Sequence, residues 1–257
     1  MRISCAGYTF NSYFREKRLT PDQYINVCAD MGLDGVELTQ YYFPETGKAY
    51  LNDLKRHLLR RGLSLAGTAI GGSFCNATED DRQKHAEFTK EWLDISARLG
   101  SPCLRVFAGP APEGHTEQEA FDWAVAGLKD CATLAQQLGV TIGLENHGGL
   151  TGTAAGLIKI LKAVKSDWVA ALLDFGNYSQ DPYAEFEMTA PYTVMTHAKP
   201  TSDFAGKRDY VDYRRVRDIM AKAGYRGFLS IEYEEPGQDA MIETPRFAAY
   251  LRGITSV

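Results

Sequence analysis

Four ionisable side chains each follow a short run of mainly apolar residues, at the place where a buried β-strand would end. They are Glu145 in IGLE, Asp174 in ALLD, His197 in VMTH and Glu232 in LSIE. A charged group at the end of a buried strand is costly unless it is paired or binds a metal. Three carboxylates placed together repel one another, and some stay protonated unless a cation is present. With one imidazole beside them, the four residue types predict a site for one divalent metal ion with oxygen and nitrogen ligands.

These four positions allow two interpretations. In the first, the four groups are unrelated, and neighbouring loops supply the hydrogen bonds of each. This interpretation is favoured for any one of the four residues taken by itself. Four such groups at matching positions favour a shared metal. Because the set contains no thiolate, it suits Mn²⁺, Mg²⁺ or Co²⁺, with Zn²⁺ as a further option, and a structural zinc site is disfavoured.

The segments that would position these residues repeat along the chain. Five times an amphipathic stretch ends on glycine and a short apolar run follows, at Gly32, Gly62, Gly100, Gly139 and Gly224. A glycine just past a helix can adopt the left-handed conformation that lets the chain reverse. The pattern predicts β-strands near 3–8, 34–38, 63–70, 102–107, 140–145, 169–174, 192–197 and 227–232, and helices near 20–31, 48–61, 79–99, 116–138, 152–165, 182–189, 210–223 and 238–252.

The alternation of strand and helix predicts a parallel sheet, and several strands are apolar without alternation, as expected for burial on both faces. Eight units in 257 residues predict an α/β fold, a (β/α)₈ TIM barrel that forms one domain over residues 1–257. An open doubly wound sheet is the alternative. It is disfavoured because no GxGxxG motif follows the first strand. In a closed barrel the ends of strands five to eight converge, which would bring the four candidate ligands together.

Composition narrows the class of partner. The chain has 28 Lys and Arg against 33 Asp and Glu, a formal net charge of −5, which disfavours nucleic acid and anionic membranes as partners. No apolar run approaches the roughly 18 residues of a membrane helix, and the first ten residues lack the pattern of a signal peptide. The five cysteines are scattered, without a CxxC pair. We therefore expect a cytoplasmic protein with reduced thiols and a small-molecule substrate, which can form a homo-oligomer.

Four segments together resemble the xylose isomerase-like barrel superfamily, which includes ketose 3-epimerases, hydroxypyruvate isomerase, inosose dehydratase and endonuclease IV. The segments are GLENHGG (143–149), LLDFGNY (172–178), THAKP (196–200) and SIEYEE (230–235), and the resemblance extends over essentially the whole chain. It implies a sugar or keto-sugar substrate and metal ligands in the order Glu, Asp, His, Glu, which fall on Glu145, Asp174, His197 and Glu232. It also implies that the two glutamates are the catalytic acid and base.

The chain departs from the ketose 3-epimerases at two positions. Those enzymes usually carry a substrate-holding His three residues after the Asp ligand, where this chain has Asn177. They also carry an Arg six residues after the His ligand, where this chain has Asp203. Lys207 and Arg208 are close in sequence, and either can replace it. The three-metal site of endonuclease IV needs a cluster of additional histidines, which this sequence does not supply.

Five residues are candidate substrate contacts: His147, Asn177, Lys199, Glu37 and Arg208. Alternatives stay open for several of them. His147 can be a loop residue bonded to backbone, Lys199 can form an ion pair at the rim, and Glu37 can form a salt bridge with Arg105. The remaining histidines, His57, His85 and His115, are expected to be solvated.

The chemistry implied is removal of a proton beside a carbonyl, with a metal stabilising the enediolate. Return of the proton gives a sugar epimerase or isomerase. Loss of a neighbouring hydroxyl or sugar-linked group from the same intermediate gives a lyase or dehydratase, and the missing His and Arg keep this alternative close. A non-catalytic sugar-binding barrel is less favoured because all four ligand positions are intact, and a nuclease is disfavoured by charge and ligand count.

Overall fold

Eight parallel strands close into a barrel in the computed structural model, which describes residues 1–255. The hydrogen-bonded order is β1-β10-β7-β6-β5-β4-β3-β2, and closure pairs Cys5 of the first strand with Ile231 of the last. The predicted (β/α)₈ barrel is therefore confirmed. The barrel strands are β1 (Arg2–Ala6), β2 (Gly35–Thr39), β3 (Ser64–Ala69), β4 (Cys103–Val106), β5 (Thr141–Glu145), β6 (Val169–Asp174), β7 (Thr193–Ala198) and β10 (Phe228–Ile231).

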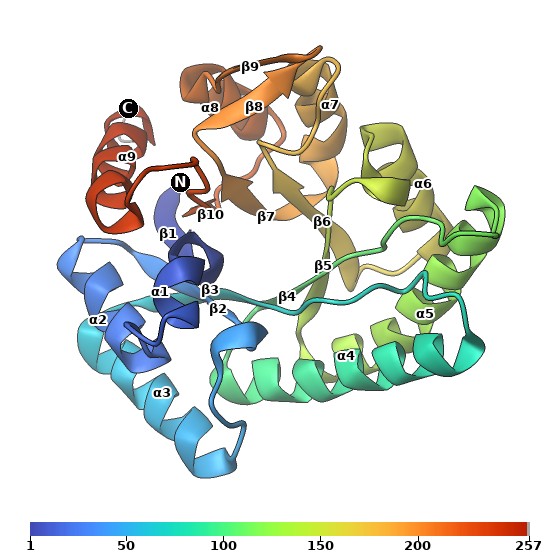
Figure 1. The fold of residues 1–257 in the computed structure, drawn as a ribbon, viewed down its shortest axis with the longest axis horizontal. Coiled ribbons are helices and arrows are strands. Elements are labelled where there is room, and N and C mark those ends of the chain that lie inside the picture. The colour runs from blue at the N-terminus through green and yellow to red at the C-terminus, as the bar shows by residue number, and fades with distance from the viewer. Residues whose placement is uncertain (256–257) are drawn as a thin grey trace.

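Helices surround the barrel, as Figure 1 shows. They are α1 (Asn11–Arg15), α2 (Pro21–Asp30), α3 (Lys48–Arg61), α4 (Glu79–Leu99), α5 (Glu117–Leu138), α6 (Ala154–Val164), α7 (Pro182–Thr189), α8 (Tyr213–Lys222) and α9 (Ala240–Thr255). Thr20 and Thr116 form capping boxes at the starts of α2 and α5, and such caps typically contribute about 1 kcal/mol each. Gly62, Gly100 and Gly139 end α3, α4 and α5 in the left-handed conformation, as their positions predicted.

The interior of the barrel is divided between an apolar and a polar layer. Ala66, Cys103, Leu172, Met195 and Phe228 form a separate buried cluster inside the barrel. A Cβ at Gly67 would lie 2.6 Å from the sulfur of Met195, so only glycine leaves room for that side chain. Burial of a large apolar side chain contributes about 1.5–3 kcal/mol. This packed layer closes the barrel beneath the polar side chains at the strand ends.

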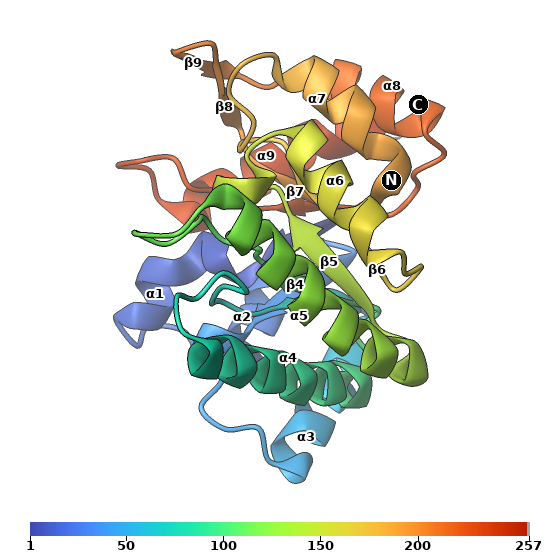
Figure 2. The same ribbon diagram turned by 90° about the vertical axis from the view of Figure 1, so that its right-hand side faces the viewer.

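Two segments differ from the sequence-based prediction. A β-hairpin of β8 (Thr201–Phe204) and β9 (Lys207–Tyr210) follows β7, so the helix expected from residue 210 begins only at Tyr213. Ala205 and Gly206 both have positive φ at the hairpin turn, as a two-residue turn between twisted strands requires. Figure 2 shows the hairpin extending from the barrel beside α7. The short helix α1 was also not predicted.

Among the described residues, no helix is both long enough and apolar enough to cross a membrane.

Candidate metal centre

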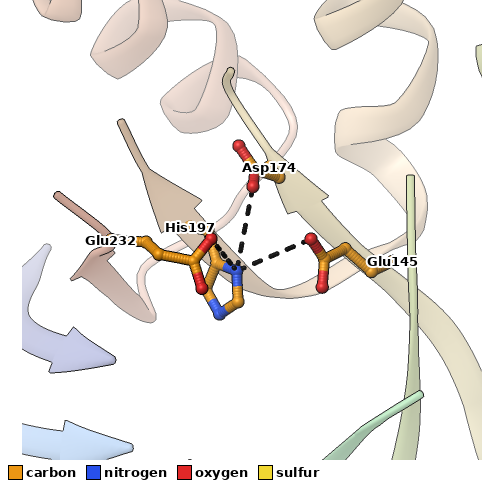
Figure 3. Close-up of side chains that lie close together, drawn as sticks. All are labelled: Glu145, Asp174, His197 and Glu232. Atoms are coloured by element: carbon orange, nitrogen blue, oxygen red, sulfur yellow. Dashed lines mark ion pairs between the residues drawn. The ribbon is translucent and has the colours of Figure 1, made fainter. Parts of the chain in front are cut away.

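Four ligand atoms from four neighbouring strands meet at the strand-end face. One atom each from Glu145, Asp174, His197 and Glu232 lies within 4.8 Å of the other three. Nδ1 of His197 is 3.8 Å from Oε1 of Glu145, 3.9 Å from Oδ2 of Asp174 and 3.5 Å from Oε2 of Glu232. Figure 3 shows the two glutamates reaching this nitrogen from opposite sides. The sequence-based grouping of these four residues is thus reproduced by the fold.

The donor set fits a divalent cation. The four residues are at most 6 % exposed, and His197 Nδ1 has no hydrogen-bond partner among residues 1–255. The four atoms lie close enough together that one divalent cation would be held by all four residues. Buried carboxylates that lie close together are stabilised by such an ion.

His197 and Asp174 each have one side-chain atom in the cluster, and a hydrogen bond to the other side-chain atom fixes the orientation of the group. His197 Nε2 lies 2.9 Å from Oε2 of Glu37; a proton on Nε2 donates to this carboxylate and leaves the Nδ1 lone pair free for a metal. The Gly176 amide donates to Asp174 Oδ1 at 2.7 Å. The Asn146 side chain binds both backbone groups of Asp174, at 2.7 and 3.0 Å.

Arg105 holds the carboxylate of Glu145. Its Nε lies 3.3 Å from Glu145 Oε2, and both side chains are buried. The guanidinium also donates to the carbonyl of Ile70 and lies over the ring of Phe107 at 4.0 Å. The alternative considered from sequence, a salt bridge between Arg105 and Glu37, is not formed, because Glu37 faces His197.

Lys199 reaches into the carboxylate cluster from the end of β7. Its ammonium lies 3.1 Å from Asp174 Oδ2 and 3.2 Å from Glu232 Oε2, and it also pairs with Glu234. Asn177 connects this lysine to the opposite side of the site, because it accepts from Lys199 and donates to Glu145 Oε1. Three of the five candidate substrate contacts, Lys199, Asn177 and Glu37, therefore touch the candidate ligands directly.

The charges of the cluster shift the pKa values of the two glutamates in the same direction. Burial raises the pKa of Glu145, but the positive charge of Arg105 and the imidazole of His197 outweigh burial, and the pKa lies below its usual value. Burial also raises the pKa of Glu232, but the positive charges of His197 and Lys199 outweigh burial, and the pKa lies below its usual value. Both glutamates are thus held as carboxylates at neutral pH.

The pKa values of the other two candidate ligands, Asp174 and His197, are raised. Burial raises the pKa of Asp174 to about 7, because the charge of Lys199 does not offset burial and the nearby glutamates. Burial lowers the pKa of His197, but Glu232 and Glu37 outweigh it and leave the pKa well above its usual value. In the absence of a bound cation the site therefore retains protons, which metal binding would release.

Three other residues singled out from the sequence lie farther from the cluster or in another environment. His147 is exposed at the mouth, where its ring lies 4.5 Å from that of Phe107. Arg208 is 61 % exposed on the hairpin and pairs with Glu235, so its contact with substrate stays a prediction. The expectation that His85 is solvated is wrong: it is 8 % exposed and packs against Phe74, because its face of α4 turns inward.

Comparison with known proteins places the fold in a family. The family model of the xylose isomerase-like TIM barrel matches residues 25–252. The chain belongs to the xylose isomerase-like TIM barrel family. No curated protein sequence matches the chain.

Solved structures with the same barrel cover nearly the whole chain at low identity. D-psicose 3-epimerase from Clostridium cellulolyticum H10, solved with D-tagatose, is 17 % identical, with 99 % of each chain covered and a TM-score of 0.82. 3-keto-D-glucoside 4-epimerase from E. coli is 14 % identical over 98 % of this chain and 99 % of that one, with a TM-score of 0.80. A xylose isomerase-like barrel from Mycobacterium smegmatis, solved with magnesium, is 17 % identical over 98 % and 96 %, with a TM-score of 0.75. These likenesses establish the fold.

Sequence reasoning missed several residues that shape this xylose isomerase-like barrel's site. Glu234 pairs with Lys199, and Asn146 fixes Asp174. Both directly follow or lie near a predicted ligand, so a polar residue next to a strand end was the available signal. Tyr41 also stands at the strand-end face, after β2, and no local pattern predicted that position.

Proposed function

We propose that this xylose isomerase-like barrel is a divalent-metal-dependent sugar isomerase or epimerase that moves the proton beside a substrate carbonyl. One observation carries the proposal. Glu145 and Glu232 approach the same small volume from opposite sides, both buried and both with a lowered pKa (Figure 3). Two opposed carboxylates can remove a proton from one face of a carbon and return it from the other.

The cation belongs at the four ligand atoms of Glu145, Asp174, His197 and Glu232. When bound there, a divalent metal would polarise the substrate carbonyl and stabilise the enediolate formed on proton loss. The set suits one ion per chain, with Mg²⁺, Mn²⁺ or Co²⁺ preferred over Zn²⁺. One structural neighbour was solved with magnesium, which supports a hard cation of this kind.

The residues around the ligands define how each glutamate acts. Arg105 fixes the orientation of Glu145 and favours its ionised form, which suits a base that takes the substrate proton. Lys199 lies against Glu232 and favours its ionised form, and a substrate oxygen can replace one of the present partners of its ammonium. Asn177 spans the two sides and can bind a substrate hydroxyl, and His147 at the mouth can do the same. Positioned acid–base groups of this kind typically contribute about 10²–10⁴-fold to the rate.

The comparisons support a sugar as the substrate. Two neighbours bear the names of sugar epimerases, D-psicose 3-epimerase and 3-keto-D-glucoside 4-epimerase. A lyase or dehydratase using the same proton removal is the second candidate, because Asn177 and Asp203 replace the two residues with which ketose 3-epimerases hold their substrate. The five cysteines, all free and buried, support a reducing compartment such as the cytoplasm.

Incubation of keto-sugars with metal-loaded protein in D₂O tests the proposal. We expect NMR to show deuterium at the carbon next to the carbonyl, with no incorporation after chelation or in Glu145→Gln. A new diastereomer or positional isomer indicates an epimerase or isomerase, and loss of a hydroxyl indicates the dehydratase. Turnover that leaves this C–H bond intact in substrate and product, without a primary isotope effect, would overturn the proton-transfer mechanism.

A further inference from the structure

A cavity of about 810 Å³ lies at the strand-end face, between the loops that follow β1 and β2. Its volume falls within the range of about 300–1,000 Å³ that is typical of small-molecule sites. None of the four candidate metal ligands lines it. Its walls are mostly aromatic and are formed by Tyr8, Phe14, Tyr41, Tyr42, Phe43 and Tyr50. Its edge is polar and includes Asn11, Arg15, Lys17 and Asp22.

The cavity adjoins the metal centre through Tyr8. This residue also lines a neighbouring cavity together with Glu234, and Glu234 pairs with Lys199, which contacts the ligand Glu232. Burial raises the pKa of Tyr8, and the charges of Glu234 and Glu232 raise it further, as expected for a hydroxyl near those carboxylates. Tyr8 thus lines both the aromatic cavity and the cavity that Glu234 lines, and a ligand that reaches from the metal centre to the aromatic cavity would pass this residue.

Tyr41 forms the other side of this passage. Its ring is 6.4 Å from that of Tyr8 at an angle of 74°, and its hydroxyl lies over Gly71, where any Cβ would clash with it. The side chain is nevertheless 45 % exposed, so a large aromatic surface faces open space at the mouth of the barrel. Exposed aromatic surface next to a polar centre is characteristic of binding sites.

Contacts within the protein hold the inner wall of the cavity. Phe14 and Tyr42 stack with centroids 4.0 Å apart and planes at 6°, and the Tyr42 hydroxyl donates to Asn11 Oδ1 at 3.1 Å. A rigid aromatic wall binds at a low entropic cost. Its apolar faces match the C–H face of a sugar ring, and the polar groups at the edge match the ring's hydroxyl groups.

We propose that this aromatic cavity is a subsite for a second sugar ring, so that the substrate is a glycoside or oligosaccharide whose reacting ring lies at the metal centre. The inference rests on the proposed function for the position of the reacting ring. Tyr8 and Tyr41 form the entrance to the subsite, and the stacked pair Phe14 and Tyr42 forms its wall.

Binding of fructose and four keto-disaccharides to the metal-loaded protein tests the subsite. Turanose, lactulose, leucrose and isomaltulose carry a second ring on different hydroxyls of the same fructose unit, so they sample different directions out of the metal centre. By calorimetry, at least one should bind about tenfold more tightly than fructose, because its second ring adds contacts with the aromatic wall. If none of the four binds more tightly than fructose, the subsite does not exist.

Substitutions at Tyr41 test whether the tighter binding of a disaccharide depends on the aromatic cavity. Tyr41→Ala should remove the tighter binding, and Tyr41→Phe, which keeps the ring, should retain it. Tyr192→Ala is the matched control, because Tyr192 is a surface tyrosine just before β7, away from the strand-end face. A preference for two rings that survives unchanged in Tyr41→Ala would overturn the proposal, provided that thermal melts show all variants folded.

The outcome separates the subsite from the proposed function. Deuterium exchange into a keto-sugar without any two-ring preference would retain the function and refute the subsite. A two-ring preference that depends on Tyr41, in a protein that exchanges no proton with any keto-sugar, would refute the function and retain the cavity as a carbohydrate-binding site.

Discussion

His197 and Glu37 are 160 residues apart in sequence, yet His197 Nε2 lies 2.9 Å from Glu37 Oε2. The carboxylate fixes the ring so that Nδ1 faces Glu145, Asp174 and Glu232. Carboxylate–histidine pairs of this type orient metal ligands and increase their basicity. We infer that Glu37 would act on a bound metal through the imidazole, and the contact with substrate suggested from its strand-end position stays a prediction.

Removing this carboxylate should weaken metal binding without removing a ligand. We expect Glu37→Leu to raise the Kd for Mn²⁺ or Co²⁺ about 10- to 100-fold, measured by calorimetry on chelator-treated protein. Glu37→Gln keeps an oxygen that can accept from Nε2, so its effect should be smaller. An unchanged Kd in a folded Glu37→Leu variant would show that the pair does not orient His197.

The ligands themselves should determine metal content. Protein purified without chelator should hold about one divalent ion per chain, as the inventory of four ligands predicts. Asp174→Ala and His197→Ala should lower this value markedly, whereas His57→Ala on α3 should not. Elemental analysis gives the count, and two or three tightly bound ions per chain would contradict a mononuclear centre.

Turnover and folding should separate at the two glutamates. Glu145→Gln and Glu232→Gln should each reduce turnover about 10²–10⁴-fold or more, because they remove a proton-transfer group and a metal ligand. The metal-free proteins should remain folded and can be more stable, because a buried carboxylate that repels its neighbours is gone. Near-normal activity of Glu145→Gln on an identified substrate would show that the acid–base assignment is wrong.

His85 should make the protein less stable in acid. Burial lowers the pKa of His85 from 6.5 to about 4, and its Nε2 has no hydrogen-bond partner among residues 1–255. Well above pH 6.5 the imidazole is neutral in both states and has no effect. As the pH falls from 6.5 to 4, only the unfolded chain takes up the proton, so the free energy of unfolding falls, by up to about 3 kcal/mol.

Replacement of the imidazole tests this contribution. His85→Leu cannot titrate, so its unfolding free energy should fall less than that of the wild type between pH 7 and pH 4.5. Urea unfolding at both pH values measures the difference, and a measurement at pH 8, where the histidine is neutral in both states, gives the packing effect alone. Equal losses in the two proteins would show that His85 is protonated in the folded state.

Much of this protein was decided by local patterns in its sequence. Short apolar runs that alternate with glycine-terminated helices predicted the eight strand–helix units. Periodicity and left-handed helix ends depend on nearby residues alone. The four candidate ligands followed from the same pattern. In a closed parallel barrel the carboxyl ends of all strands lie at one face, so charged residues at the ends of apolar runs lie together at that face.

The tertiary structure decided which side chains meet across that face. It paired Glu37 with His197 rather than with Arg105, brought Lys199 among the carboxylates, buried His85, and set two aromatic loops around a cavity. The sequence also did not predict the hairpin of β8 and β9, which delays α8 to Tyr213. These contacts join residues that are distant in the chain, and they depend on strand register, barrel closure and the direction of each side chain. Such quantities are determined by packing of the whole molecule and are not encoded in any one segment.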